Sequence, residues 1–195
     1  MKIFTAGQIV GWVILGVVVI VLALLVFWVI GTYNKLVVGR NKVKNSWSQI
    51  EVQLKRRFDM IPNLVETVKG FATQEKDIFM EFAKARKMFS EGSSSGNVEE
   101  MAKANAMLSR SIAVVVEQYP QLKSDQSFLK LQDTLQDTEN KVAFSRQFYN
   151  DVVLSFNNMR EVFPSNIVAG IFKFKEAQLF KLDEEEEAKA PKIKF

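Results

Sequence analysis

A long apolar run near the amino terminus limits what this chain can fold into more than any other feature. From Ile9 to Ile30 the residues are aliphatic, aromatic or glycine, and no charged residue stands between Lys2 and Lys35. At about 1.5 Å of rise per helical residue, roughly 20 such residues cross a hydrocarbon layer of about 30 Å. The run therefore predicts a transmembrane helix over about residues 9–30, within an amino-terminal segment of residues 1–34.

A cleaved signal peptide is the competing interpretation of this run. Such a peptide has an apolar stretch of about 7–15 residues and then a cleavage site of the Ala-x-Ala kind. Here the stretch is longer and continues into Gly31 and Tyr33 without such a site. Trp12, Trp28 and Tyr33 lie near the two ends of the run, where amphipathic rings prefer the headgroup layer. We therefore expect the helix to be retained as a single membrane anchor.

The basic residues that flank the run predict its orientation. Only Lys2 precedes it, whereas Lys35, Arg40, Lys42 and Lys44 follow closely. The positive-inside bias places the more basic flank in the cytoplasm. We expect the amino terminus outside the bacterial inner (cell) membrane and the soluble domain inside. The four basic residues that follow the run are expected at the membrane surface, in contact with anionic lipid.

Histidine and cysteine are both absent from the sequence. Their absence excludes a Ser-His-Asp or Cys-His nucleophile, a His-ligated zinc site and a Glu-x-x-His di-iron site within this chain. No phosphate-binding glycine loop or dinucleotide signature occurs. The net charge of +4 is too mild to suggest nucleic-acid binding. We expect no catalytic, cofactor or metal site, and no nucleic-acid partner.

Beyond the anchor, apolar residues recur at steps of three and four, which is the pattern of a buried helical stripe. Pro62 lies inside the stripe and predicts a kink, because proline lacks an amide donor and clashes with the preceding turn. The phase is unchanged across Pro62, which favours a kink over a reversal. The stripe comprises Val43, Trp47, Ile50, Leu54, Phe58, Ile61, Leu64, Val68, Phe71, Ile78, Phe82, Ala85 and Phe89.

Small polar residues at 91–97 predict the first loop. A second helix is expected from about Val98 to Gln118, ended by Pro120. A third helix, capped by Ser124 or Asp125, continues to about residue 163. A short fourth helical segment is expected at 165–169.

The predicted fold class is therefore all-α. A transmembrane helix continues into an antiparallel helical bundle of three long helices plus a short fourth, over residues 35–170. Residues 171–195 form a tail with an acidic run at 183–187. The tail is either a frayed terminus or a docking segment, in which Ile193 and Phe195 enter a groove on this subunit or a neighbour.

A polar strip on the first helix is a candidate contact with another subunit or partner. Gln49, Gln53, Arg56, Arg57 and Asn63 gather there. The strip is either a solvated helix face or a contact in which Gln53 and Asn63 make directional hydrogen bonds. Arg57 is expected to meet an acidic residue at position 51 or 59, on its own or a neighbouring helix.

With these elements placed, the chain resembles the LemA family of bacterial membrane proteins. The resemblance covers nearly the whole chain and is most specific between Trp47 and Gly70. It rests on Tyr33–Val37, Arg40–Val43, Trp47–Arg57, Asp59–Gly70, Ala85-Arg86, Glu117–Lys123, Leu131-Gln132, Glu139–Ala143, Tyr149-Asn150, Phe163-Pro164 and Pro191–Phe195. It implies a single-pass protein of the cell membrane with a soluble helical bundle and no established enzymatic activity. Some relatives take part in magnetosome formation, and others accompany membrane metalloproteases.

Three functions are compatible with these features. The favoured one is a non-enzymatic membrane scaffold that self-associates as a homo-oligomer and organises or shapes the membrane, helped by the small-residue pair Gly7 and Gly11. The second is an accessory subunit of another membrane protein, such as an envelope-stress metalloprotease. The third, least favoured, is an enzyme that uses Glu, Lys or Arg alone.

Overall fold

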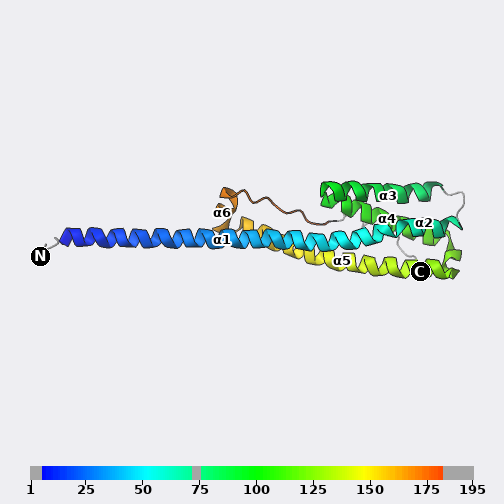
Figure 1. Cartoon of the computed structure of the whole chain (residues 1–195), viewed down its shortest axis with the longest axis horizontal. Helices are drawn as coiled ribbons and strands as arrows, with labels where there is room; N and C mark the ends of the chain where they lie inside the picture. The colour runs from blue at the N-terminus through cyan, green and yellow to red at the C-terminus, as the bar shows by residue number, and fades with distance from the viewer. Residues whose placement is uncertain (1–5, 72–75, 182–195) are drawn as a thin grey trace, which may run out of the picture. The chain divides into compact units, whose positions relative to one another are not determined.

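The computed structural model describes residues 6–71 and 76–181, and this part of the chain is helical with no strand. The elements are α1 (Ala6–Asp59), α2 (Ile61–Lys69), α3 (Lys76–Ser95), α4 (Val98–Gln118), the 3-10 helix η1 (Pro120–Ser124), α5 (Gln126–Glu161) and α6 (Ser165–Ile171) (Figure 1). The all-α class and the long apolar amino-terminal helix are therefore confirmed.

The described residues form two compact units. The first unit contains residues 6–42 and 155–176, and the second contains residues 43–154 and 177–181. Helices α1 and α5 contribute to both units. The boundaries predicted from the sequence, 1–34, 35–170 and 171–195, stay predictions.

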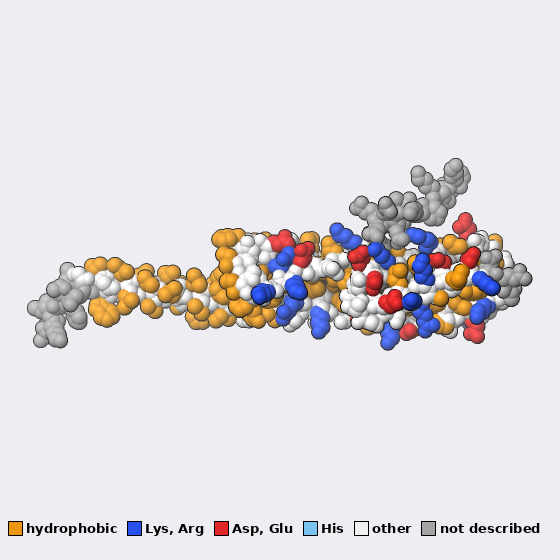
Figure 2. Space-filling view, turned by 90° about the horizontal axis from the view of Figure 1, so that it is seen from above, with side chains coloured by type: hydrophobic (Ala, Val, Ile, Leu, Met, Phe, Trp, Pro, Cys, Tyr) orange, Lys and Arg blue, Asp and Glu red, His pale blue; other side chains and the backbone are white. Residues whose placement is uncertain are grey.

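The first unit is dominated by the apolar part of α1. This helix is long and apolar enough to cross a membrane, with a mean hydropathy of 3.4 in its most apolar window and none of that window buried. Figure 2 shows the surface of this apolar part covered with hydrophobic side chains and free of charged ones. Farther along α1 Leu36 is buried, and α5 and α6 contribute the buried Phe156, Val168 and Ala169 to the same unit.

The second unit has a core made by α1 to α5. Leu54, Phe82, Met101, Leu108 and Phe128 are fully or almost fully buried and belong to one hydrophobic cluster. Each of these side chains lies on the apolar stripe of its own helix. Burying such stripes against one another is the main source of stability for helices that would be marginal alone.

The predicted stripe from Val43 to Phe89 is divided into three helices. At Pro62 the prediction of a kink is confirmed: Met60 keeps helical backbone angles, and Pro62 lies in the first turn of α2, where a missing amide hydrogen costs nothing. The expected continuation from Phe71 to Phe89 is wrong. Helix α3 runs antiparallel to α1, since Phe89 stacks on Phe58 with ring centroids 4.2 Å apart, and Ser93 bonds to Glu51. Periodicity could not reveal this reversal, because two antiparallel helices each bury a stripe of the same period.

The first loop is shorter than predicted. Helix α3 continues to Ser95, and the chain turns at Gly96, whose φ of +68° favours glycine. Gly92, expected in the loop, is buried where α3 meets α4. Asn97 then caps α4 by accepting hydrogen bonds from the amides of the residues at 99 and 100.

The later predictions agree with the structure. Helix α4 has the expected bounds, and Pro120 begins η1 immediately after it. Asp125 caps α5, because its carboxylate accepts a hydrogen bond from the amide of Phe128 at 2.8 Å. The short fourth segment is α6.

Candidate functional site

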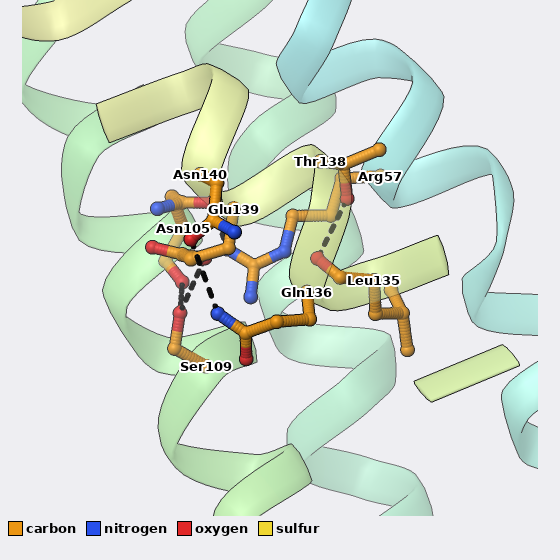
Figure 3. Close-up of polar contacts among 8 residues, drawn as sticks. All are labelled: Arg57, Asn105, Ser109, Leu135, Gln136, Thr138, Glu139 and Asn140. Atoms are coloured by element: carbon orange, nitrogen blue, oxygen red, sulfur yellow. Dashed lines mark hydrogen bonds and ion pairs between the residues drawn. The ribbon is translucent and has the colours of Figure 1, made fainter. Parts of the chain in front are cut away.

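A buried arginine lies at the centre of the polar contacts of the second unit (Figure 3). Arg57 projects from α1 with only 4% of its side chain exposed and pairs with Glu139 of α5. Its Nη1 also donates to Oδ1 of Asn105 on α4, at 2.5 Å. Ser109 of α4 donates to the same Glu139 carboxylate at 3.2 Å. One guanidinium thus joins three helices.

This arrangement follows from the position of Arg57 on α1. It comes three residues after Leu54 and one before Phe58, so the helix turns it toward the core. A guanidinium removed from water needs hydrogen bonds and a countercharge. Burial lowers the pKa of Arg57, and the neighbouring Glu139 carboxylate opposes this shift. The group stays charged, since arginine is protonated at any ordinary pH.

An open groove passes beside this network. It has a volume of about 710 Å³ and runs between α4 and α5, with Arg57 and Glu139 among its lining residues. Ile112, Val116 and Leu135 give it an apolar side. The rest of its lining is mostly polar or charged and includes Glu117, Lys123 and Gln132. No group of acidic residues that could hold a metal ion occurs within 6–71 and 76–181.

The structure separates the members of the predicted polar strip. Gln49, Arg56 and Asn63 are exposed, whereas Gln53 is half-buried and its Oε1 is buried without a hydrogen-bond partner among the described residues. The prediction that Arg57 meets residue 51 or 59 is wrong, because its acidic partner lies on α5. The sequence offered no signal for this partner, since residues 57 and 139 are far apart in the chain.

The four residues predicted at the membrane surface, Lys35, Arg40, Lys42 and Lys44, are all exposed on α1. The guanidinium carbon of Arg40 lies 5.4 Å from the ring centroid of Phe174, a cation–π contact within the first unit. The contact of these four basic residues with lipid stays a prediction. Ile193 and Phe195, the predicted docking residues of the tail, lie outside the described residues.

Residues 177–181, the last described part of the chain, pack against helices of the second unit. The side chain of Phe180 is 1% exposed, and Trp47 contacts both Tyr149 and Phe180, with ring centroids 5.4 and 6.0 Å apart. The hydroxyl of Tyr149 donates to the carbonyl of Gln178 at 2.7 Å. The amide of Asn150 bonds to both backbone groups of Phe180. Sequence reasoning missed this contact; the polar amide at 150 was its one available signal.

Fold and contacts together define a class: a protein whose described elements are all helical, with one long apolar amino-terminal helix and a helical bundle joined by the ion pair of a buried arginine. The family model described as the LemA family matches residues 46–195, so the chain belongs to the LemA family.

Curated relatives agree at low identity. Magnetosome protein MamQ 2 of Paramagnetospirillum magneticum (strain ATCC 700264 / AMB-1) is 26% identical, with 76% of this chain and 64% of the relative covered. Magnetosome protein MamQ of Magnetospirillum gryphiswaldense is 25% identical, with the same coverage. Protein LemA of Metamycoplasma hominis is 22% identical, with 77% of this chain and 69% of the relative covered. The chain thus spans less than two thirds of the length of these MamQ proteins. Family and relatives support a membrane-associated protein of the LemA type, and none of these names is that of an enzyme.

Proposed function

We propose that this protein is a non-enzymatic, single-pass scaffold that self-associates in the bacterial cell membrane and organises that membrane. Helix α1 supplies the anchor, because its stretch from Val10 to Ile30 carries no charge and is long enough to span the hydrocarbon layer. The basic residues after this stretch favour a cytoplasmic position for the second unit. The resemblance to magnetosome proteins supports a role at membranes rather than in free solution.

The observation that carries self-association is an exposed aromatic pair on α5. Phe144 is 75% exposed and Phe148 is 48% exposed. One helical turn separates them, so they lie on the same face, and Asp151 continues that face. Exposed aromatic clusters of this kind are typical of interfaces, where phenylalanine is enriched relative to the free surface.

A second copy of the same chain is the occupant that this face fits. Copies anchored by the same helix share one orientation in the membrane, so the pair on α5 lies on the same side of the bilayer in every copy. A symmetric contact requires that each subunit present the same patch to its partner. Confinement to one surface also raises the effective concentration of copies.

Size measurement in mild detergent tests this proposal. Light scattering after gel filtration is expected to give an oligomer for the natural chain and a smaller species for the double variant Phe144→Ser/Phe148→Ser. Leu129→Ser is the matched control, because Leu129 is also an exposed apolar residue of α5. A monomer for the natural chain, or equal sizes for all three proteins, would contradict self-association through α5.

A second candidate, an accessory subunit of another membrane protein, is favoured by the groove between α4 and α5. Its apolar wall of Ile112, Val116 and Leu135 is suited to a helix from a partner. The exposed Ala113 lines the same groove. If Ala113→Arg abolishes co-purification of a membrane protein while the natural chain is monomeric, the accessory role replaces the scaffold.

A further inference from the structure

Helix α6 and its flanking turns leave an unusually apolar surface on the first unit. Four large side chains there are exposed: Phe163 by 75%, Ile167 by 52%, Ile171 by 67% and Phe172 by 49%. We name these four residues the α6 apolar surface. Ile167 and Ile171 are one helical turn apart and share a face. A cluster of this size exposed to water would be costly, so it marks a contact with something apolar.

The place of this surface along α1 identifies what it contacts. Within the first unit, the ring of Tyr33 lies 4.7 Å from that of Phe172 and 5.8 Å from that of Phe174. Tyr33 comes three residues after Ile30, the last residue of the apolar run, or about 4.5 Å farther along the helix axis. That distance falls within the headgroup layer, which is roughly 5–7 Å thick on each side of the hydrocarbon core and is enriched in tyrosine. The aromatic contact therefore places the α6 apolar surface beside the edge of the bilayer.

The backbone at the end of α6 determines how Phe172 and Phe174 reach the ring of Tyr33. Helix α6 ends in a Schellman motif, in which the amide of Lys173 bonds to the carbonyl of Gly170 and the amide of Phe174 to that of Ala169. Lys173 takes the left-handed conformation, with a φ of 54°, so the chain reverses direction there. The reversal lets Phe172 and Phe174 contact the same tyrosine ring.

The charges of the first unit match an anionic lipid surface. Glu161 and Glu176 are both paired with Arg160. The remaining charged side chains of its described residues are basic and exposed: Lys35, Arg40, Lys42, Lys173 and Lys175. Apolar side chains next to basic ones are the composition of a segment that lies in a membrane interface.

We propose that α6 is a second membrane contact, in which the α6 apolar surface enters the headgroup layer of the bilayer spanned by α1, while Lys173 and Lys175 bind lipid phosphates. This inference rests on the membrane anchoring of the proposed function and does not require self-association. Its consequence is mechanical: the first unit is fixed to the bilayer at two points, so it resists tilting about the end of the anchor.

Spin labels can locate this surface, because the chain has no cysteine and single cysteines can be placed at will. The full chain is reconstituted in vesicles of phosphatidylcholine with phosphatidylglycerol. Labels are attached at Ile171→Cys and, in a second variant, at Ile167→Cys. Collision rates with oxygen, which concentrates in lipid, and with a water-soluble nickel complex are then measured by electron paramagnetic resonance.

A several-fold higher ratio of oxygen to nickel collisions is expected at both α6 positions than at Met80→Cys, a control that is also apolar and 60% exposed but lies on α3 in the second unit. A label at Val19→Cys tests the anchor itself. Lipid-like values at Val19 with water-like values at Ile167 and Ile171 would overturn the α6 proposal and leave the anchor intact. Low accessibility to both reagents at α6, as in a contact between copies, would also overturn it. Water-like values at Val19 would overturn the anchoring on which both proposals rest.

Discussion

The side-chain amide of Asn150 bonds to both backbone groups of Phe180. Its Nδ2 donates to the carbonyl oxygen of Phe180 at 3.1 Å, and its Oδ1 accepts from the amide nitrogen of Phe180 at 2.9 Å. Phe180 lies outside the helices, so its backbone N–H and C=O have no helical hydrogen-bond partners. The side chain of Asn150 supplies both hydrogen bonds. The contact holds the carboxyl-terminal segment against α5 and seats the phenyl ring of Phe180 in the core.

The variant Asn150→Leu is expected to lower the free energy of unfolding by about 1–3 kcal/mol, because two buried backbone groups lose their partners. Phe180→Ala should cost roughly 3–5 kcal/mol through loss of a buried ring. Urea unfolding of the full chain in detergent, followed by circular dichroism, measures both. Asn140→Leu is the matched control, since Asn140 is exposed on α5 and bonds only to Gln136 among the described residues. Equal losses for Asn140→Leu and Asn150→Leu would contradict this role for Asn150.

The ion pair between Arg57 and Glu139 predicts an asymmetric response to mutation. Glu139→Gln leaves a buried guanidinium without a countercharge and should cost about 3 kcal/mol of unfolding free energy. Arg57→Met leaves only a carboxylate that is 35% exposed and can reach water, so its cost should be about 1 kcal/mol. The double variant Arg57→Met/Glu139→Gln should be more stable than Glu139→Gln alone. Chemical denaturation ranks the three variants by free energy of unfolding. If Arg57→Met were less stable than Glu139→Gln, the arginine would not be the buried member of the pair.

Close contact between α3 and α4 depends on Gly92. A Cβ added at this residue would lie 3.0 Å from Cγ of Met101 and 3.2 Å from its backbone nitrogen. Gly92→Ala should therefore destabilise the second unit by about 1–2 kcal/mol, since overpacking outweighs the gain in helix propensity. Gly170→Ala, where nothing lies within 4 Å of the added atom, is the control. A rise in melting temperature for Gly92→Ala would mean that the two helices can separate without cost.

The hydroxyl of Tyr149 predicts a pH dependence. Burial raises the pKa of Tyr149 from 10.0 to about 12. Because the folded-state pKa lies above the unfolded one, the stabilisation is complete below pH 10 and is lost as the pH rises to about 12. The stability of the natural chain relative to Tyr149→Phe should fall by up to about 1.4 kcal/mol per pH unit in that interval. Paired urea titrations between pH 9 and 11.5 measure the difference and cancel the titration of lysines. A difference that does not change with pH would indicate that water reaches the hydroxyl.

Local signals in the sequence predicted the helices, and contacts between distant residues did not follow from them. Pro62, Pro120 and Asp125 mark helix boundaries because their effects act within one turn. The bounds of α4 were predictable for the same reason. The reversal before α3 was not, because an apolar period of three to four residues is the same for one bent helix and for two antiparallel ones.

The candidate site also has features that the sequence predicted and features that it did not. Exposure of Gln49, Arg56 and Asn63 agrees with the solvated face that the sequence allowed. Pairing of Arg57 with Glu139 could not be predicted, since it depends on how α1 and α5 come together. Docking of Ile193 and Phe195 stays a prediction, because both lie outside the described residues. Burial of Phe180 was not predicted, because the apolar pattern did not distinguish it from its neighbours.

Cross-linking between copies in the membrane tests the central claim most directly. Asp151→Cys introduces a single thiol on the exposed face of α5 and leaves Phe144 and Phe148 in place. The control Ala83→Cys has its thiol on an exposed position of α3. After mild oxidation of isolated membranes, we expect a covalent dimer for Asp151→Cys and little or none for Ala83→Cys, at the same protein density. Equal cross-linking of the two variants, or none for Asp151→Cys, would contradict a scaffold that associates through this face.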